Sequence, residues 1–220
     1  FWTKISKLNI NNFGGVPYTY EILDKIKFYN KDLYNIKYTT HAGGKLNKDL
    51  WKKIVCNYKK LNIQFISMYG SSESTARMSY IPWKYSQKKM GSIGKPIPGG
   101  KFLIKDLKGK RILKYNKVGN LYYKGKNIFM GYSNKIEDLQ KKNKNNNLLM
   151  TGDKAYRDKD NFFYLVSRDE RFAKIFGHRI NLSEIENSLL DIGITNICRH
   201  YDDNKIHIYL DNKNKYDKTR

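Results

Sequence analysis

Apolar residues recur at two different periods in the N-terminal part of the chain. Residues 36–40 and 62–68 are short runs rich in apolar and β-branched side chains, which predicts strands. Residues 18–29 and 46–60 instead place apolar side chains on one side of a helical repeat, which predicts amphipathic helices. Pro17 suits the first position of the first helix, because that position needs no amide hydrogen. The alternation of helix and strand favours an α/β fold.

The helical repeat also predicts which side chains of the two helices face the core. Residues four positions apart lie on the same face of a helix. Residues 13–17, where two glycines precede a proline, predict a turn before the first helix. The side chains expected to face the core are Tyr18, Ile22, Ile26 and Tyr29 in the first helix and Leu46, Leu50, Ile54 and Tyr58 in the second.

The C-terminal part of the chain has shorter elements. Residues 141–147 are a run of Asn and Lys, which favours a mobile loop over an interaction site. Glycine at position 193 is a suitable end for a preceding helix. The predicted elements are strands at 148–150, 162–166, 194–199 and 205–210 and a helix at 184–191.

Glycines and polar side chains follow the predicted strands where each strand ends. Gly43 and Gly44 follow the strand at 36–40, and the sequence Tyr69-Gly70-Ser71-Ser72-Glu73 follows the next one. Open α/β sheets bind their ligands beyond the carboxyl ends of the strands. An aromatic ring, hydroxyls and a carboxylate within one turn could contact a nucleotide and Mg²⁺. The alternative is a tight turn with solvated side chains.

Asp153 and Arg168 are a second pair of candidate site residues. Asp153 follows the apolar run at 148–150, and Arg168 follows the strand at 162–166. A carboxylate accepts hydrogen bonds from sugar hydroxyls, and a guanidinium group donates in a forked geometry that suits phosphate. Taken alone, such a pair is more typical of a surface salt bridge.

The charge of the chain is strongly positive. It has 43 Lys and Arg against 20 Asp and Glu, a formal net charge of +23. Clustered cations are typical of nucleic-acid-binding proteins. Here the lysines are spread over nearly every segment and accompany many Asn, Ile and Tyr residues. We therefore interpret the charge as a compositional bias and expect no nucleic-acid partner, with a nucleic-acid-binding module as the alternative.

Cysteine content and hydropathy suggest the cellular location. Cys56 and Cys198 lie far apart in the sequence, which favours two buried thiols over a disulfide or a metal site. No apolar run approaches the length of a membrane span, and no signal peptide opens the sequence. We therefore expect a cytoplasmic protein with no membrane partner. The first residue is Phe1, and we expect the chain to be a fragment of a longer enzyme.

The candidate residues fall into motifs of one known family. Tyr69-Gly70-Ser71-Ser72-Glu73 resembles the Tyr-Gly-x-Thr/Ser-Glu motif of the adenylate-forming superfamily, which includes acyl-CoA synthetases, peptide-synthetase adenylation domains and luciferases. Several such segments in the order of the family are much more specific than any one of them. The others are Gly91-Ser92-Ile93-Gly94-Lys95-Pro96, Gly119-Asn120-Leu121 with Gly125 and Gly131-Tyr132, Thr151-Gly152-Asp153, and the stretch from Ser167-Arg168 to Glu186.

The resemblance implies a mixed α/β (α+β) fold with a domain boundary. Residues 1–168 would form the C-terminal part of the large AMP-binding domain, and residues 169–220 the start of the small C-terminal α/β domain. The hinge between them would be Glu170, which keeps a charged side chain where the family has Asp or Lys. Ser167 and Asn120 depart from the usual glycine and glutamate of the motifs.

The resemblance also implies a role for each candidate residue. The adenine would stack on Tyr69 beside Gly70 and be lined by Gly43, Gly44 and Lys45, and the ribose would be held by Asp153 and Arg168. Ser72 would contact the α-phosphate, and Glu73 would bind Mg²⁺. Lys174 would lie in the segment that shapes the thioester-forming site, or would be a solvated lysine.

The implied activity is that of an ATP-dependent acid ligase. It would activate a small carboxylic acid as acyl-AMP and transfer it to the thiol of CoA or of a carrier-protein phosphopantetheine. The family's phosphate loop and its C-terminal catalytic lysine have no counterpart in these residues, so we expect no adenylation activity from the chain alone. Alternatives are an amino-acid adenylation domain and an inactive, truncated nucleotide-binding remnant.

Overall fold

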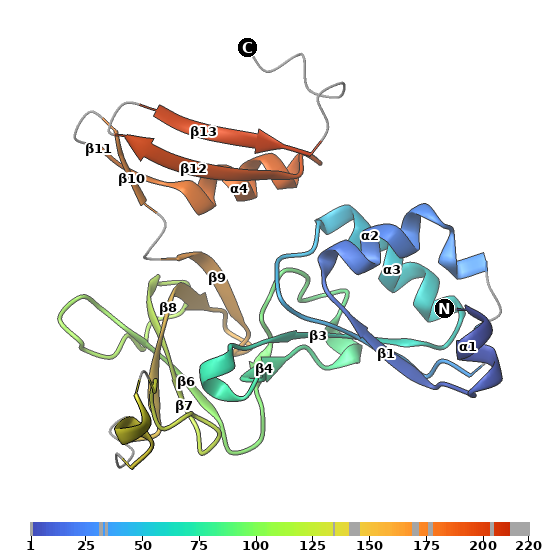
Figure 1. Cartoon of the computed structure of the whole chain (residues 1–220), viewed down its shortest axis with the longest axis horizontal. Coiled ribbons are helices and arrows are strands. Elements are labelled where there is room, and N and C mark those ends of the chain that lie inside the picture. The colour runs from blue at the N-terminus through green and yellow to red at the C-terminus, as the bar shows by residue number, and fades with distance from the viewer. Residues whose placement is uncertain are drawn as a thin grey trace.

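The computed structural model describes residues 2–30, 33, 35–133, 135–140, 146–168, 172–175, 178–202 and 205–211. The described elements form four sheets: a five-stranded sheet, a four-stranded sheet and two two-stranded sheets near the C-terminus (Figure 1). The helices are α1 (Trp2–Lys7), α2 (Pro17–Lys25), α3 (Lys48–Lys60) and α4 (Leu182–Asp191), with short 3-10 turns η1 (Phe28–Asn30), η2 (Ser72–Ser74), η3 (Trp83–Tyr85) and η4 (Ile136–Gln140).

The first sheet has five strands in the order β1-β2-β3-β4-β5. Its strands β1 to β3 are parallel, and β4 and β5 continue the sheet in antiparallel pairing. Helices α2 and α3 pack on this sheet through a core that includes Tyr20, Ile54, Tyr58 and Phe65. The strands are β1 (Asn12–Gly15), β2 (Tyr38–His41), β3 (Gln64–Tyr69), β4 (Ser79–Tyr80) and β5 (Lys95–Pro96).

The second sheet is antiparallel, with the order β6-β7-β8-β9 and a core of its own. Phe102, Leu121, Tyr123 and Phe163 are buried in this core. Tyr69 at the end of β3 packs against the same core, so the two sheets meet where β3 ends. The strands are β6 (Lys101–Lys105), β7 (Gly119–Lys124), β8 (Leu148–Arg157) and β9 (Phe163–Arg168).

The C-terminal elements surround a third, smaller core. Ala173, Leu182 and Cys198 are buried there. Helix α4 covers the hairpin β12-β13, and this part forms the upper layer in Figure 1. Its strands are β10 (Phe172–Ile175), β11 (His178–Asn181), β12 (Asn196–Asp202) and β13 (Lys205–Leu210).

The Gly91–Pro96 motif joins the first two sheets. The Ser92 hydroxyl donates to the Phe163 carbonyl at 2.9 Å, and the Ile93 amide donates to the same carbonyl at 2.8 Å. The Phe163 amide donates back to the Gly94 carbonyl at 3.2 Å. Since β5 is joined to β3 through β4, and β9 is paired with β8, these contacts connect the first sheet to strands β8 and β9 of the second.

The predicted mixed α/β fold is confirmed, but three local predictions are wrong. Residues 13–15 belong to strand β1 and not to a turn. The first helix ends at Lys25, and it buries Tyr20 and Leu23, whereas Tyr18 is 65% exposed. The physical reason is that α2 starts directly after β1, which turns Tyr20 toward the sheet, with its ring against the Gly15 backbone.

The other predicted elements of the first sheet are found with shifted ends. Strands β2 and β3 and helix α3 correspond to the three predicted segments, and Leu46, Ile54 and Tyr58 are buried as expected. Strands β6 and β7 were not predicted. The predicted loop at 141–147 lies outside the described residues apart from Asn146 and Asn147.

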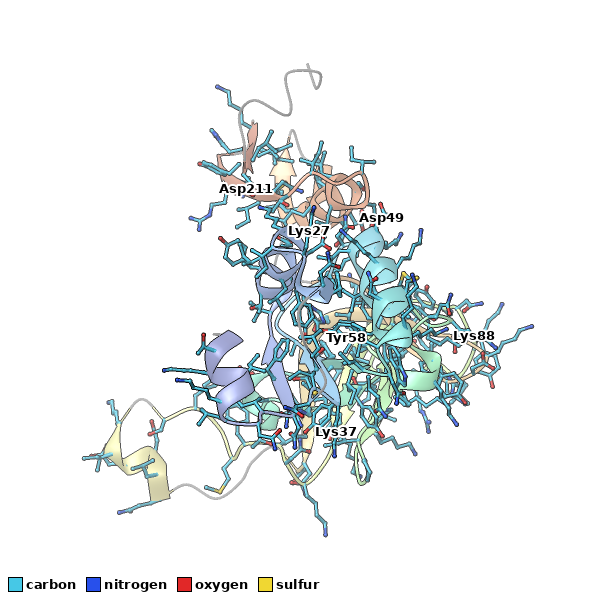
Figure 2. All side chains as sticks on the ribbon, turned by 90° about the vertical axis from the view of Figure 1, so that its right-hand side faces the viewer. Lys27, Lys37, Asp49, Tyr58, Lys88 and Asp211 are labelled. Atoms are coloured by element: carbon cyan, nitrogen blue, oxygen red, sulfur yellow. The ribbon has the colours of Figure 1, made fainter. Side chains whose placement is uncertain are left out.

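Figure 2 shows the side chains of the described residues on the ribbon. Lys27, Lys37 and Lys88 are exposed, while Tyr58 is buried on the inner face of α3. Cys198 is buried as predicted, whereas Cys56 is exposed, which corrects the expectation for that thiol. Across the part of the chain that the structure describes, no helix combines the length and apolar character needed to cross a bilayer.

His41 is a buried titratable group in the first core. Its ring lies among Tyr20, Trp51 and Phe65, its Nδ1 is 3.2 Å from the Ser67 hydroxyl, and its Nε2 has no hydrogen-bond partner. Burial disfavours the charged ring and lowers the pKa of His41 from 6.5 to about 4. The folded protein therefore resists protonation of this side chain.

Acidification from pH 7 to pH 4 is expected to destabilise the chain through His41. As the pH falls through 6.5, His41 becomes protonated in the unfolded state but stays neutral in the folded state. The free energy of unfolding therefore decreases until the folded ring also becomes protonated near pH 4. The contribution is about 3 kcal/mol. The free energy of unfolding is measured in urea. At pH 7 it should be about 1 kcal/mol lower in His41→Leu than in the wild type, because the hydrogen bond of His41 is missing. On acidification it should fall less in His41→Leu than in the wild type. Equal acid-induced losses in both chains would contradict this prediction.

Candidate functional site

Tyr69 and Asp153 meet although they are 84 residues apart in the sequence. The Tyr69 hydroxyl donates a hydrogen bond of 2.5 Å to Asp153 Oδ2. Tyr69 ends β3 of the first sheet, and Asp153 lies in β8 of the second. The contact places the aromatic ring and the carboxylate at one edge where the two sheets join.

Asp153 lies in an irregular part of β8. Between the pairs Asn120 with Lys154 and Tyr122 with Met150, β7 has the single residue Leu121 while β8 has Thr151, Gly152 and Asp153. The Thr-Gly-Asp motif is therefore a bulge, a feature that redirects side chains near functional sites. It corrects the expectation that Asp153 lies just past the end of its strand.

Local hydrogen bonds fix this bulge. The Thr151 hydroxyl donates to the Leu121 carbonyl at 2.9 Å and accepts from the Asp153 amide at 3.2 Å. Gly152 has a φ of +75°, a conformation that glycine adopts without strain. Asp153 is 4% exposed. The carboxylate is thus held in one position within β8, an inner strand of the second sheet.

The strand register brings Asp153 opposite Arg168 in β9. The two predicted ribose contacts are therefore on neighbouring strands. The side chains of Arg168 and Lys174 lie outside the described residues, as does Glu170. The backbone of Lys174 is in β10, opposite Arg179 of β11.

The turn that follows Tyr69 carries Ser72 and Glu73 in the short helix η2. Gly70 is required there, because a Cβ atom would lie 2.3 Å from the Ala76 carbonyl oxygen. Ser72 is exposed and Glu73 is partly buried. The turn therefore carries a hydroxyl and a carboxylate on consecutive residues, three and four positions after Tyr69.

Glu73 has partners that sequence reasoning missed. The Tyr132 hydroxyl donates to Glu73 Oε1 at 2.6 Å, and the Phe129 amide donates to the Glu73 carbonyl at 2.8 Å. Tyr132 was part of the recognised Gly-Tyr segment, but nothing in its spacing indicated a contact with Glu73. Only the packing of the segment after β7 on this turn reveals it.

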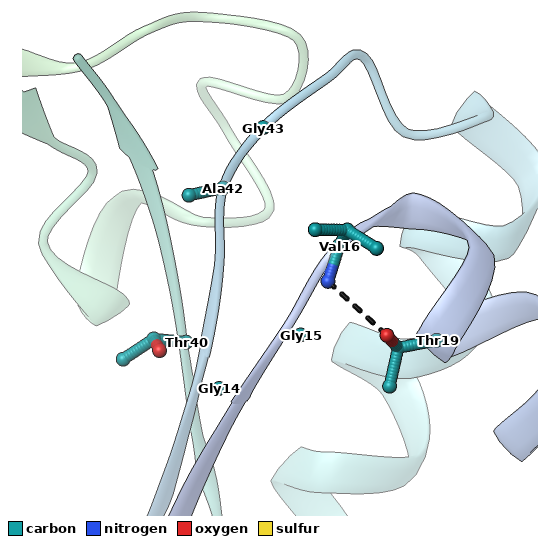
Figure 3. A pocket seen from close by; sticks show the side chains of 7 residues that line it. All are labelled: Gly14, Gly15, Val16, Thr19, Thr40, Ala42 and Gly43. Atoms are coloured by element: carbon teal, nitrogen blue, oxygen red, sulfur yellow. Dashed lines mark hydrogen bonds between the residues drawn. The ribbon is translucent and has the colours of Figure 1, made fainter. Parts of the chain in front are cut away.

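Gly43 lies beside a cavity between the ends of β1 and β2 (Figure 3). The cavity has a volume of about 460 Å³. The wall contains small side chains and glycine backbone, so a ligand can approach the main chain closely. The lining residues are Gly14, Gly15, Val16, Thr19, Thr40, Ala42 and Gly43.

Lys45, by contrast, contacts the C-terminal elements. Its ammonium group donates to Asn187 Oδ1 at 3.1 Å and lies 3.5 Å from Asp191 Oδ1. Asn47, whose side chain accepts from two amides at the start of α3, donates to the Leu190 carbonyl at 3.0 Å. The loop after β2 is therefore joined to the end of α4.

The turn after β3 offers the carboxylate of Glu73 to a metal ion. In the residues that the structure describes, no group of three or more His, Cys, Asp or Glu side chains could surround one. Mg²⁺ commonly takes only one or two carboxylates from the protein and fills its other positions with water and phosphate oxygens. Glu73 beside the hydroxyl of Ser72 fits that arrangement.

The sequence matches a family model over residues 1–133, and the model describes an AMP-binding enzyme. A luciferin 4-monooxygenase from Luciola mingrelica is 30% identical over 177 residues, which is 80% of this chain and 31% of that protein. 4-Hydroxybutyrate–CoA ligase 1 from Metallosphaera sedula is 27% identical over 195 residues, 86% of this chain and 33% of that protein. The chain thus spans about a third of the length of these relatives.

Solved structures share the fold. The o-succinylbenzoate CoA synthetase of Bacillus subtilis, in complex with the acyl-adenylate OSB-AMP, superposes with a TM-score of 0.73 and 21% identity, covering 94% of this chain and 42% of that one. The chain belongs to the AMP-binding enzyme family, within the adenylate-forming superfamily.

Proposed function

We propose that the chain takes part in an ATP-dependent acid–thiol ligase reaction. In the first step a carboxylate oxygen attacks the α-phosphorus of ATP, and the bond to pyrophosphate breaks. In the second step a thiol sulfur attacks the acyl carbon, and AMP leaves. The observation that carries the proposal is the hydrogen bond from Tyr69 to Asp153, since it brings a ring for the base and a carboxylate for the ribose to one edge.

Different residues contact the base, the ribose and the phosphates of the nucleotide. The adenine stacks on Tyr69 beside Gly70, with the loop Gly43–Lys45 along the base, and the ribose hydroxyls donate to Asp153 with Arg168 on the neighbouring strand. Ser72 donates to the α-phosphate. When Mg²⁺ is bound it neutralises phosphate charge, and Glu73 is the residue that would hold it. Holding the phosphate and the acid in line supplies much of the rate by proximity.

The thiol step requires the C-terminal elements. We place the domain boundary after Arg168, with Glu170 as the hinge and Lys174 in the segment that meets the thiol substrate. The separate core of β10 to β13 and α4 supports this division. Two relatives, 4-hydroxybutyrate–CoA ligase 1 and 4-coumarate–CoA ligase-like 2, are named for CoA ligation, which favours CoA over a carrier protein as the acceptor.

Calorimetric titration of the chain with AMP tests the nucleotide site. We expect micromolar binding of AMP and of a non-hydrolysable acyl-sulfamoyl adenosine. Binding of 2′,3′-dideoxy-AMP should be at least about tenfold weaker, because both hydrogen bonds to Asp153 are missing. GMP serves as the control for the base. Equal affinity for AMP and its dideoxy form would overturn the proposed ribose contact, and no adenosine binding at all would overturn the proposed site.

A further inference from the structure

Asn127, in the segment after β7, bridges two carbonyl groups of the turn that holds Glu73. Its Nδ2 donates to the Ser74 carbonyl at 2.7 Å and to the Arg77 carbonyl at 3.1 Å. Its Oδ1 accepts from the Tyr123 hydroxyl at 2.9 Å. Tyr123 is fully buried in the core of the second sheet. The amide of Asn127 thus connects the turn to a rigid part of the molecule.

The two carbonyl groups flank a strained stretch of backbone. Thr75 has a φ of 52° and Ala76 a φ of 67°, so two successive residues with side chains adopt the left-handed conformation. That conformation costs free energy for residues other than glycine and persists only when surrounding contacts hold it. The bridge by Asn127 spans these two residues and is one such contact. Without it, the turn after Glu73 is expected to relax.

The same segment also holds Glu73 itself. The Phe129 amide donates to its main-chain carbonyl at 2.8 Å, and the Tyr132 hydroxyl donates to its Oε1 at 2.6 Å. The rings of Phe129 and Tyr132 pack edge to face at 4.9 Å. Both the backbone and the carboxylate of Glu73 are therefore fixed from one neighbouring segment.

We propose that Asn127 and Tyr132 are positioning residues that hold the Glu73 carboxylate in the orientation that receives a Mg²⁺ ion bound with the nucleotide phosphates. This inference rests on the proposed function, in which Glu73 is the protein's ligand for that ion. Asn127 fixes the backbone of the turn, and Tyr132 orients the carboxylate. In this role neither residue needs to contact the nucleotide.

The test of Tyr132 compares two ligands. The chain is titrated with α,β-methylene-ATP in Mg²⁺ and in EDTA, and separately with AMP. In the wild type we expect Mg²⁺ to tighten binding of the ATP analogue. In Tyr132→Phe that gain should shrink about fivefold, as expected for the loss of one exposed hydrogen bond to a charged group. AMP affinity should be unchanged, because Tyr69 and Asp153 are intact.

Tyr18→Phe is the matched control. Tyr18 is 65% exposed and Tyr132 is 74% exposed, and Tyr18 lies on α2, away from the turn. In Tyr18→Phe, Mg²⁺ should increase the affinity for the ATP analogue as much as it does in the wild type. A full gain in Tyr132→Phe would overturn the role of Tyr132. AMP binding without any gain from Mg²⁺ in the wild type would remove the metal role of Glu73 and the inference with it, while a wild type that binds neither ligand refutes the proposed function itself.

A second variant tests the turn without any ligand. Asn127→Asp keeps the size of the side chain but removes both donor hydrogens. Trypsin can cleave after Arg77, whose carbonyl accepts a hydrogen bond from Asn127. In Asn127→Asp, loss of one or two hydrogen bonds should make this cleavage about tenfold faster. Mass spectrometry of the fragments measures the rate. An unchanged cleavage rate at Arg77 would show that Asn127 does not hold the turn.

Discussion

Asp153→Asn is expected to weaken AMP binding about a hundredfold while the chain remains folded. The substitution keeps the shape of the side chain and removes the charge that accepts hydrogen bonds from the ribose. A hydrogen bond to a charged group contributes about 1.5–3 kcal/mol. Weakening both ribose hydrogen bonds to Asp153 should therefore reduce the binding free energy by about 3 kcal/mol in total. The measurement is calorimetric titration with AMP, with thermal unfolding as the check on folding.

Two further variants separate the ribose contact from general effects. Asp49→Asn removes a carboxylate from an exposed position on α3, where the side chain is 84% exposed, and should leave AMP affinity unchanged. Tyr69→Phe keeps the ring for the base but loses the hydrogen bond to Asp153, so it should weaken AMP about fivefold. If Asp153→Asn binds AMP as tightly as Asp49→Asn does, the proposed site is wrong.

Gly94→Ala is expected to destabilise the chain by about 4 kcal/mol, from backbone strain and overpacking together. Gly94 has a φ of +82°, and a Cβ atom there would lie 2.0 Å from the Tyr80 carbonyl oxygen. A main-chain atom cannot rotate away as a flexible side chain does. The same residue bridges β9, so the junction between the two sheets should loosen. Urea unfolding followed by tryptophan fluorescence measures the effect.

Gly91→Ala is the control for Gly94→Ala within the same motif. Gly91 has a φ of +78°, close to that of Gly94, but no atom lies within 4 Å of its would-be Cβ. Gly91→Ala should lower the free energy of unfolding by only about 1 kcal/mol, because only the backbone is strained. The difference between the two variants therefore isolates the clash with Tyr80. Equal destabilisation at both positions would show that the junction tolerates the added carbon.

The sequence predicted the elements whose patterns are local. The apolar period of α3 and the β-branched runs of β2 and β3 identified these elements, with ends shifted by a few residues. The inner face of α2 was predicted wrongly, since Tyr18 and Tyr20 are both aromatic and a short helix gives few repeats. Because α2 begins directly after β1, its first turn is oriented so that Tyr20 is buried.

Motif order by itself determined the family of the chain and the set of candidate residues, because glycines, hydroxyls and acids at fixed spacings are written directly in the sequence. Tertiary structure decided what these residues touch. The bulge at Asp153, its contact with Tyr69, and the attachment of Glu73 to Tyr132 all join segments from different strands. Lys45 likewise contacts α4, which no local pattern indicated. Local spacing constrains neighbours along the chain, whereas contacts between distant segments depend on how the two sheets pack.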